Sequence, residues 1–464
     1  MTIKSKWPKL GTLLLAGFVL AACGDNGQDN QEGQDNQTQE ENAPSNGEEA
    51  SSEETSGEAS DQEGSDDQAS NGETVEITFW HAMNGPHQEA LTALTDEFNA
   101  SQDQYFVNEQ SQGEYGDLNQ SVTAAAVSDE LPTMAQLTPT DVPEWASNDL
   151  IVPLTDDFLT SNGLDQEAID DIYPGFLESG TFDGERYAMP FSKSTRIMFY
   201  NQDILDEYGV EVPETWDQVL DLADQMIEAG DDAYAMGFEN SFEMEWETMA
   251  RQNGSDFVDP DSGTVDLNGP EAVEALELIQ GMLEDGQART AGEDGFMSGP
   301  FGNGASALYI GSSAGTTHVA PAAEGINWST APIPTFNDTE LTFFAGNDLG
   351  LFSSASEEEQ AGFVAYLSFL LEPENAAQWA IDTGYVPVRE EAINSDLYQN
   401  YLEENPEYEA PTQMLSYGMS SPTFEGYGEF RNNMVTAMEE VSVNGVAPQD
   451  ALDSLQEQTE QILN

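Results

Sequence analysis

The stretch Val75-Glu76-Ile77-Thr78-Phe79-Trp80, with the pattern that follows it, decides the fold class. Its alternation of apolar and polar residues predicts a strand. Pro86 then opens a predicted helix, because four apolar side chains recur on one face: Ala90, Leu91, Leu94 and Phe98. Further strands are predicted at 105–107 and 134–137, with a helix at 118–127 between them. This alternation predicts an α/β lobe with a mainly parallel sheet.

A second α/β region is predicted further along the chain. Asp183-Gly184 favours a tight hairpin turn and leads into strands predicted at 187–191 and 196–201. Thr215 and Gln218 form a capping box at the start of a strongly amphipathic helix. The foldable part is long enough for two lobes with cores of their own.

The first 22 residues are typical of a signal peptide. Three lysines precede an apolar run at 10–22 that is too short to span a bilayer as a permanent helix. The run ends in Leu20-Ala21-Ala22-Cys23, which resembles a bacterial lipobox. That resemblance implies cleavage before Cys23 and attachment of fatty acyl chains, such as palmitate, to its thiol. The alternative is a buried helix that happens to carry a cysteine. Cys23 is the only cysteine, so an intramolecular disulfide is excluded.

Residues 24 to 74 predict a disordered acidic tether, because they contain no aromatic residue, Lys or Arg. The whole chain has 89 Asp and Glu against 10 Lys and Arg, a formal net charge of −79. Such a charge repels phosphates and excludes nucleic acid as a natural partner. It also favours an extracellular, halophilic setting, in which salt screens the repulsion among acids.

Six short motifs occur along the chain in the same order as in a known protein family. Together they resemble family 1 extracellular solute-binding proteins of ABC importers, which share the maltose-binding-protein fold, and most closely the sn-glycerol 3-phosphate-binding branch. The motifs are Phe79-Trp80-His81-Ala82-Met83, Tyr187-Ala188-Met189-Pro190, Phe199-Tyr200-Asn201-Gln202-Asp203, Pro213-Glu214-Thr215-Trp216, Pro373-Glu374-Asn375-Ala376-Ala377 and Thr383-Gly384-Tyr385-Val386-Pro387.

The resemblance implies a two-lobe, type II binding-protein fold with three interlobe crossings and a ligand between the lobes. The crossings are expected near 190–194, 343–346 and 385–389. The expected domain bounds are 1–22 for the signal peptide, 23–74 for the acylated Cys23 and tether, 75–190 with 343–388 for the N-terminal lobe, and 191–342 with 389–464 for the C-terminal lobe.

The resemblance also implies ligand contacts at matched positions: Tyr115, Ser194, either Ser312 or Ser313, Gly346, Tyr385 and Arg431. Arg431 matches an arginine that pairs the phosphate, and the alternative for it is an internal salt bridge. Asp141 is the candidate replacement for an acid that the branch carries after its third strand. The aromatic pair that boxes a choline headgroup in some relatives has no clear match, although Phe238, Phe242 and Trp246 lie nearby.

Trp80 and His81 are further candidates, because they follow a strand end, where ligands bind in open sheets. The alternative is a core tryptophan and a hydrogen-bonded histidine. His87 and His318 have no metal-like spacing with His81, so no metal site is predicted. No phosphate-binding loop or dinucleotide fingerprint is present, so no cofactor is predicted.

The leading hypothesis is a monomeric binding protein without chemistry of its own. It would capture glycerol 3-phosphate, a glycerophosphodiester or a sugar, and deliver it to permease subunits at the outer face of the cytoplasmic membrane. An extracellular carbohydrate-active enzyme and a surface adhesion module remain alternatives. Carboxylates are so frequent in this composition that pairs of them carry no catalytic information.

Overall fold

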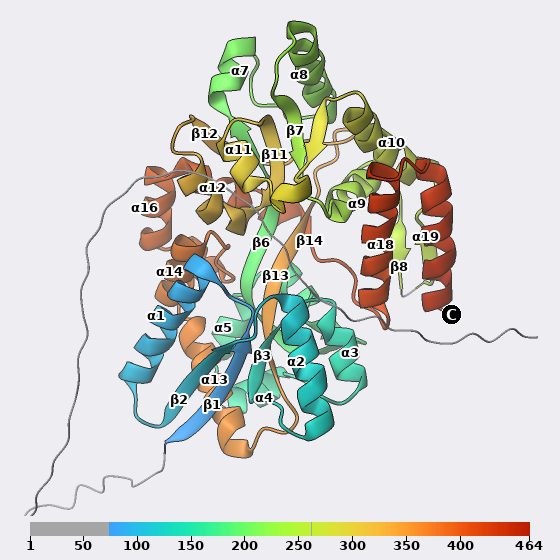
Figure 1. The fold of residues 1–464 in the computed structure, drawn as a ribbon. Coiled ribbons are helices and arrows are strands. Elements are labelled where there is room, and N and C mark those ends of the chain that lie inside the picture. The colour runs from blue at the N-terminus through green and yellow to red at the C-terminus, as the bar shows by residue number, and fades with distance from the viewer. Residues whose placement is uncertain (1–73, 261) are drawn as a thin grey trace, which may run out of the picture. The chain divides into compact units, whose positions relative to one another are not determined.

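The computed structural model describes residues 74–260 and 262–464. The predicted signal peptide, Cys23 and nearly all of the predicted tether lie outside these residues. The described part belongs to one compact unit, built on a ten-stranded sheet (Figure 1). The sheet runs in the order β10-β7-β11-β6-β13-β3-β1-β2, with β12 paired to β6 and β14 paired to β13.

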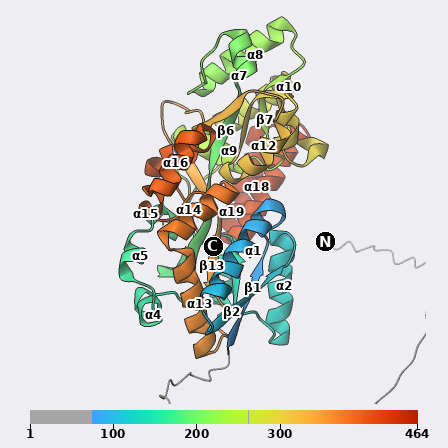
Figure 2. The same ribbon diagram turned by 90° about the vertical axis from the view of Figure 1, so that its left-hand side faces the viewer.

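The N-terminal lobe has the predicted strand–helix alternation. β1 (Val75–His81) pairs in parallel with both β2 (Tyr105–Ser111) and β3 (Met134–Leu137). Three helices pack around these strands (Figures 1 and 2): α1 (Gly85–Ser101), α2 (Tyr115–Ser128) and α13 (Glu357–Leu370). The helices bury the apolar faces that the sequence predicted, which confirms the α/β class.

The C-terminal lobe repeats the pattern. β7 (Tyr234–Phe238) pairs in parallel with β10 (Ala288–Thr290) and β11 (Ser306–Ser312). α8 (Trp216–Ala229) begins with the predicted capping box. A single large apolar cluster joins these strands to α8, α10 (Pro270–Glu284), α18 (Tyr427–Ser442) and α19 (Pro448–Ile462).

The two lobes share β6 (Ala188–Asn201) and β13 (Thr342–Leu351). The sequence predicted two strands at 187–191 and 196–201, but the structure has one strand of 14 residues. The reason is that each half has its own partner: 188–195 pair with β13, and the second half pairs with β11 and β12. A third crossing lies beside them, where the Val386 amide donates to the Lys193 carbonyl at 2.7 Å.

The segment after the third crossing stays near the N-terminal lobe. Arg389 donates to the Leu371 carbonyl and to Asp171. α16 (Asp396–Glu404) shares a small apolar cluster with α14 (Pro373–Thr383), and α15 (Glu390–Ile393) contacts both helices. The structure therefore places 389–404 against N-terminal-lobe elements, although the expected C-terminal lobe begins at 389.

The other elements are short. They are α3 (Asp141–Ser147), α4 (Asp156–Ser161), α5 (Gln166–Asp170), α6 (Pro174–Glu178), β4 (Thr181–Phe182), β5 (Glu185–Arg186), α7 (Gln202–Tyr208), α9 (Glu243–Gln252), β8 (Phe257–Asp259), β9 (Thr264–Asp266), η1 (Gly292–Asp294), α11 (Ser298–Gly302), η2 (Ser313–Gly315), α12 (Thr316–Ala322), β12 (Trp328–Ala331), η3 (Pro406–Tyr408), α17 (Ala410–Gln413), η4 (Leu415–Tyr417) and β14 (Gly418–Met419).

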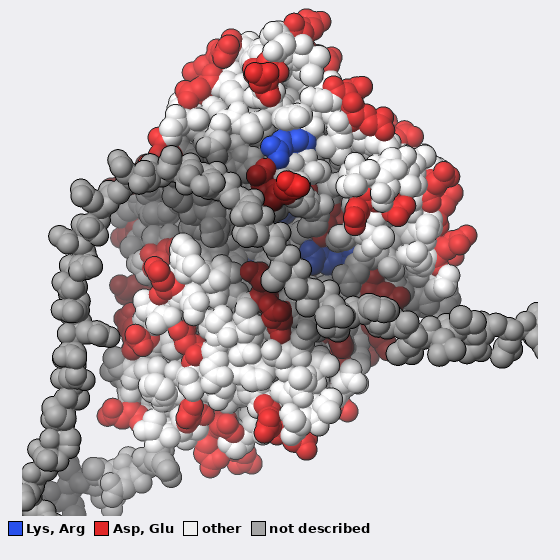
Figure 3. Space-filling view, viewed as in Figure 1, with Lys and Arg blue, Asp and Glu red and all other residues white. Residues whose placement is uncertain are grey.

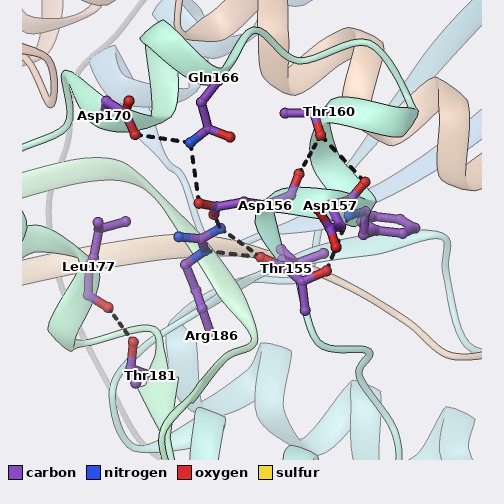
Figure 4. Close-up of polar contacts among 11 residues, drawn as sticks. Thr155, Asp156, Asp157, Thr160, Gln166, Asp170, Leu177, Thr181 and Arg186 are labelled. Carbon is purple, nitrogen blue, oxygen red and sulfur yellow. Dashed lines mark hydrogen bonds and ion pairs between the residues drawn. The ribbon is translucent and has the colours of Figure 1, made fainter.

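All seven Lys and Arg side chains of the described residues form ion pairs. Arg186 shows how they are used (Figure 4): it donates to the Leu154 carbonyl and to Asp156 at the start of α4. Gln166 then links Asp156 to Asp170. The cation thus joins the hairpin β4–β5, which forms at the predicted Asp183-Gly184 turn, to the helices beside it.

Lys193 is the most deeply buried cation of the described residues. Its Nζ lies 2.5 Å from Asp348 and 2.6 Å from Ser179 Oγ, and Ser179 donates to the other Asp348 oxygen at 2.9 Å. The Lys193 and Asp348 side chains are at most 2 % exposed. Burial lowers the Lys193 pKa, and the attraction of Asp348 opposes that shift. The pair joins β6 to β13 where the lobes meet.

Lys193→Met should destabilise the protein by about 3 to 5 kcal/mol, because it leaves the Asp348 carboxylate buried without a counter-charge. Adding Asp348→Leu should recover most of that loss, since apolar pairs replace buried ion pairs at little cost. Chemical denaturation of the three proteins measures both effects. A single variant as stable as the wild type would contradict this role for the ion pair.

Candidate functional site

The predicted ligand residues lie where the lobes meet. The carboxyl ends of β1 and β3 in one lobe and of β7 and β10 in the other reach this boundary, the position at which open α/β sheets bind ligands. The first turn of α18 meets the loop after β3, since a Cβ at Gly428 would lie 3.9 Å from the Thr140 carbonyl oxygen. The site is therefore built from both lobes.

Tyr115 and Tyr385 are brought together. Tyr115 is the first residue of α2, and Tyr385 follows α14, yet their hydroxyls lie close enough for each to shift the pKa of the other. Asn347 Nδ2 donates to the Tyr115 hydroxyl at 2.9 Å. Burial raises the pKa of both tyrosines, so both phenols are neutral at physiological pH. The tyrosines and the amide form one uncharged, hydrogen-bonded patch.

Gly346 lies directly before Asn347 on β13. Its φ is +104°, and a Cβ there would lie 1.8 Å from the Ser192 carbonyl oxygen. Only glycine fits such an approach of β13 to β6. The pairing of the two strands shifts register between Asn347 and Asp348, as at a β-bulge. Gly346 therefore allows the close strand contact that the tyrosine patch needs.

The three candidate serines lie along the hinge. Ser194 is buried on β6, opposite Ala345 of β13. Ser313 Oγ accepts from the Thr195 amide at 3.3 Å and is buried, whereas Ser312 caps η2 and is partly exposed. Ser313 is thus committed to holding β6, and Ser312 is the more accessible of the two.

Arg431 lies in the first turns of α18 and is 44 % exposed. Its Nη2 donates to Glu243 at 2.9 Å, and the second Glu243 oxygen is buried without a partner among the described residues. The alternative interpretation of Arg431, an internal salt bridge, is therefore present in the structure. The pairing leaves much of the guanidinium facing outward.

The aromatic residues near this wall do not form a box for a ligand. Phe238, Phe242 and Trp246 are fully buried, and the Trp246 indole donates to the Ala272 carbonyl at 2.9 Å. They belong to the apolar core of the C-terminal lobe. None of these three residues therefore supplies the aromatic pair that had no clear match in the sequence.

Asp141 is buried at the start of α3 and accepts hydrogen bonds from Asn119 and from Thr138. Burial raises its pKa, and these hydrogen bonds oppose the shift. The Asp141 charge also raises the pKa of Tyr115. The structure therefore places an acid beside the tyrosine patch, although its oxygens are already used in holding the loop after β3.

Similarity to known proteins decides the family. A family model described as bacterial extracellular solute-binding protein matches residues 93–408, more than half of the chain. The chain belongs to the bacterial extracellular solute-binding proteins. Proteins of this family work outside the cytoplasm, where they bind substrates that are then transported. They are not enzymes.

Two kinds of relatives are similar to this solute-binding protein. The sn-glycerol-3-phosphate-binding periplasmic protein UgpB of Escherichia coli K12 is 25 % identical over 407 residues, 83 % of this chain and 92 % of the relative. UgpB of Mycobacterium tuberculosis with glycerophosphocholine has a TM-score of 0.75 at 22 % identity, covering 84 % of this chain and 99 % of that one. The GacH receptor of Streptomyces glaucescens, solved with acarbose, has a TM-score of 0.74 at 20 % identity, covering 84 % and 98 %. These structures show a shared two-lobe fold.

Trp80 and His81 of the solute-binding protein lie at different depths. Trp80 is partly exposed, and its indole donates to Gln110 at 3.1 Å. His81 is fully buried against Phe79, and its Nδ1 accepts from the Met83 amide. Nε2 has no partner among the described residues, and burial lowers the His81 pKa to about 4. The structure gives His81 a neutral core position.

The other two histidines meet across the lobe boundary. The ring of His87 on α1 lies 5.5 Å from His318 on α12 and 5.4 Å from Tyr385, and its Nε2 is 3.0 Å from the Thr383 carbonyl. Burial and His318 lower the His87 pKa. No group of three His, Cys, Asp or Glu among the described residues could hold a metal ion.

The surface of the solute-binding protein is strongly acidic. Asp and Glu are spread over the visible face of the protein, and Lys and Arg show in only a few places (Figure 3).

A groove of about 610 Å³ between the lobes is lined by Glu178 and Asp183 on one side and Arg251 and Asp256 on the other, without any of the predicted ligand residues. In the part of the chain that the structure describes, no helix is long and apolar enough to cross a membrane.

Sequence reasoning missed Asn347 and Glu243. Asn347 lies next to Gly346, so the glycine match pointed at its neighbour, but nothing local indicates which way its side chain faces. Glu243 is one of 89 acids and carried no signal of its own. Its role appears only because Arg431, 188 positions away, folds onto it.

His81→Leu should reduce the loss of stability on acidification. The His81 pKa is lower in the folded state than its ordinary value of 6.5, so the unfolded state binds more protons and stability falls as pH drops from 6.5 towards 4. Between these pH values the wild type should lose up to about 3 kcal/mol more than the variant. Urea unfolding at several pH values measures this difference. Equal acid losses in both proteins would contradict it.

Proposed function

We propose that the chain is the ligand-capturing subunit of an ABC importer. It takes up glycerol 3-phosphate or a glycerophosphodiester between its lobes and delivers it, unchanged, to permease subunits. The observation that carries the proposal is the position of Arg431. It is half exposed on α18, beside the N-terminal-lobe loop of Thr140.

Two features of α18 suit an anion. The helix has 16 residues, and Arg431 projects from its N-terminal turns, where the partial positive charge of a helix is concentrated. Only one hydrogen bond, to Glu243, engages the Arg431 guanidinium among the described residues. The remaining N–H groups can bind a phosphate ester in the two-pronged geometry that arginine favours.

The neutral residues then take the other end of the ligand. Tyr115, Tyr385 and the strand at Gly346 supply an uncharged patch suited to glycerol hydroxyls, with Ser194 and Ser312 or Ser313 as further donors. Closure of the lobes around the ligand is the motion that such a hinge permits. No step of bond making or breaking is required, so the proposal excludes enzymatic turnover.

A sugar is the second candidate. The observation in its favour is the Arg431–Glu243 pair, because a carboxylate beside the arginine reduces its attraction for a phosphate dianion. A neutral oligosaccharide needs no net positive charge in its site. Its hydroxyls hydrogen-bond to paired polar side chains, and its rings pack against tyrosines. The relative solved with acarbose agrees with this candidate at the level of the fold alone.

We also propose that Cys23 anchors the protein. The lipobox-like end of the predicted signal peptide motivates an acylated cysteine, which two acyl chains would hold at the outer face of the cytoplasmic membrane. The acidic residues from 24 onwards would act as the tether, and the folded part would act as a monomer. The family's work outside the cytoplasm agrees with this arrangement.

Arg431→Gln should weaken the binding of glycerol 3-phosphate tens to thousands of times, or about 2 to 5 kcal/mol, because a charge-assisted contact in a desolvated site is lost. Isothermal titration calorimetry with glycerol 3-phosphate and with maltotriose measures the effect. Arg251→Gln is the control, since Arg251 pairs with Glu247 in the other groove and should change affinity little. If the wild type binds maltotriose and not glycerol 3-phosphate, the assignment of a phosphate ligand is wrong.

Cys23→Ser should release the protein from the membrane or leave the precursor uncleaved, because serine offers no thiol for acylation. Fractionation of cells that express wild type or variant, followed by mass determination of the mature N-terminus, gives the answer. A variant that is processed normally and stays in the membrane fraction would rule out the lipid anchor.

A further inference from the structure

Asn347 has a polar group that the fold does not use. Its side chain is fully buried, and its Nδ2 donates to the Tyr115 hydroxyl at 2.9 Å. Its Oδ1 is buried and has no hydrogen-bond partner among the described residues. A buried carbonyl without a donor destabilises the folded protein. An unpaired acceptor within a predicted ligand site indicates that the ligand supplies its hydrogen-bond donor.

The strand register places this amide on the face of the ligand residues. Asn347 lies opposite Ser192, and Ala345 lies opposite Ser194. Residues directly opposite each other in an antiparallel pair share one face of the sheet, so Asn347 shares a face with Ser192 and Ser194. The Lys193 side chain takes the other face and holds Asp348 there.

Successive side chains of a strand point to opposite faces, and Asn347 and Asp348 do so. One residue directs its amide to Tyr115, and the next directs its carboxylate to Lys193 and Ser179. The ion pair of Asp348 and the amide of Asn347 therefore occupy adjacent positions on opposite faces of β13.

The hydrogen-bond directions define what the site can bind. The Tyr115 hydroxyl has an oxygen that accepts hydrogen bonds and a hydrogen that donates one. Asn347 donates to that oxygen. The Tyr115 hydrogen is then left to donate, beside an Asn347 oxygen that is left to accept.

We infer that Asn347, together with Tyr115, binds one free hydroxyl group of the ligand. A hydroxyl both donates and accepts, so it satisfies the Asn347 oxygen and the Tyr115 hydrogen at once. A phosphate dianion only accepts, and its oxygens are repelled by the Asn347 carbonyl. The inference rests on the proposed function and deepens it: the ligand presents a neutral polyol end here, whichever group Arg431 binds.

Calorimetry of Asn347→Leu tests the inference, because leucine keeps the branched shape of the side chain and removes the acceptor together with the amide donor. The probes are glycerol 3-phosphate, maltotriose, and propyl phosphate, which keeps the phosphate and lacks both hydroxyls. The wild type should bind glycerol 3-phosphate or maltotriose. We expect the variant to bind that same probe at least about tenfold more weakly than the wild type does. For glycerol 3-phosphate, the preference over propyl phosphate should shrink by the same factor. Unchanged affinity and preference would overturn the inference.

A second readout needs no ligand. If Asn347 serves a ligand, Asn347→Leu should change the melting temperature of the free protein little, because losing the hydrogen bond to Tyr115 is offset by removing an unpaired buried carbonyl. If Asn347 serves the fold, the melting temperature should fall, and the inference is then wrong. A wild type that binds none of the probes would count against the proposed ligands, while the melting temperatures would still decide the role of Asn347.

Ser306→Ala is the matched control. Ser306 on β11 is fully buried, and its Oγ also lacks a partner among the described residues, but it lies in the C-terminal-lobe sheet beside Gly237 and Met297. Its removal should keep or raise the melting temperature, and leave affinity for every probe unchanged. A loss of affinity in Ser306→Ala equal to that in Asn347→Leu would show a general effect of core changes and overturn the inference.

Discussion

The buried junction at Lys193 is the constraint on which the rest of the structure depends. All three interlobe crossings meet there: Lys193 belongs to the first, its ion-pair partner Asp348 to the second, and its carbonyl accepts from Val386 of the third. Two charges in a dry core hold only when each satisfies the other, so the strands have little freedom to slide. A hinge built in this way can bend between the lobes while it keeps its register.

The scarcity of cations sets how the remaining charges are used. With 89 acids in the chain, any arginine finds a carboxylate, and every cation of the described residues does. Most of these pairs staple neighbouring elements, as Arg186 staples a hairpin to a helix start (Figure 4). Arg431 differs because its pair stands half exposed at the lobe boundary. The Glu243 carboxylate reduces the attraction of Arg431 for anions.

The hinge ion pair and the predicted site meet where β13 pairs with β6. Two consecutive residues, Asn347 and Asp348, have different tasks: the amide contacts Tyr115 and the carboxylate contacts Lys193. Gly346 makes this possible, since its positive φ and the nearby Ser192 carbonyl leave no room for a side chain. The buried ion pair and the proposed ligand contacts thus occupy three adjacent positions, 346 to 348.

The sequence by itself determined the α/β class, the Asp183-Gly184 turn and the Thr215 capping box, because periodicity, turn chemistry and capping act within a few residues. Its family resemblance also pointed to Tyr115, Tyr385 and Gly346, which the structure brings into one region. Only the tertiary structure decided that β6 is continuous, that His81 and Phe242 are buried, that Glu243 takes Arg431, and that Asn347 faces Tyr115. Those outcomes depend on strand register and on partners far away in the chain, and no local pattern encodes either.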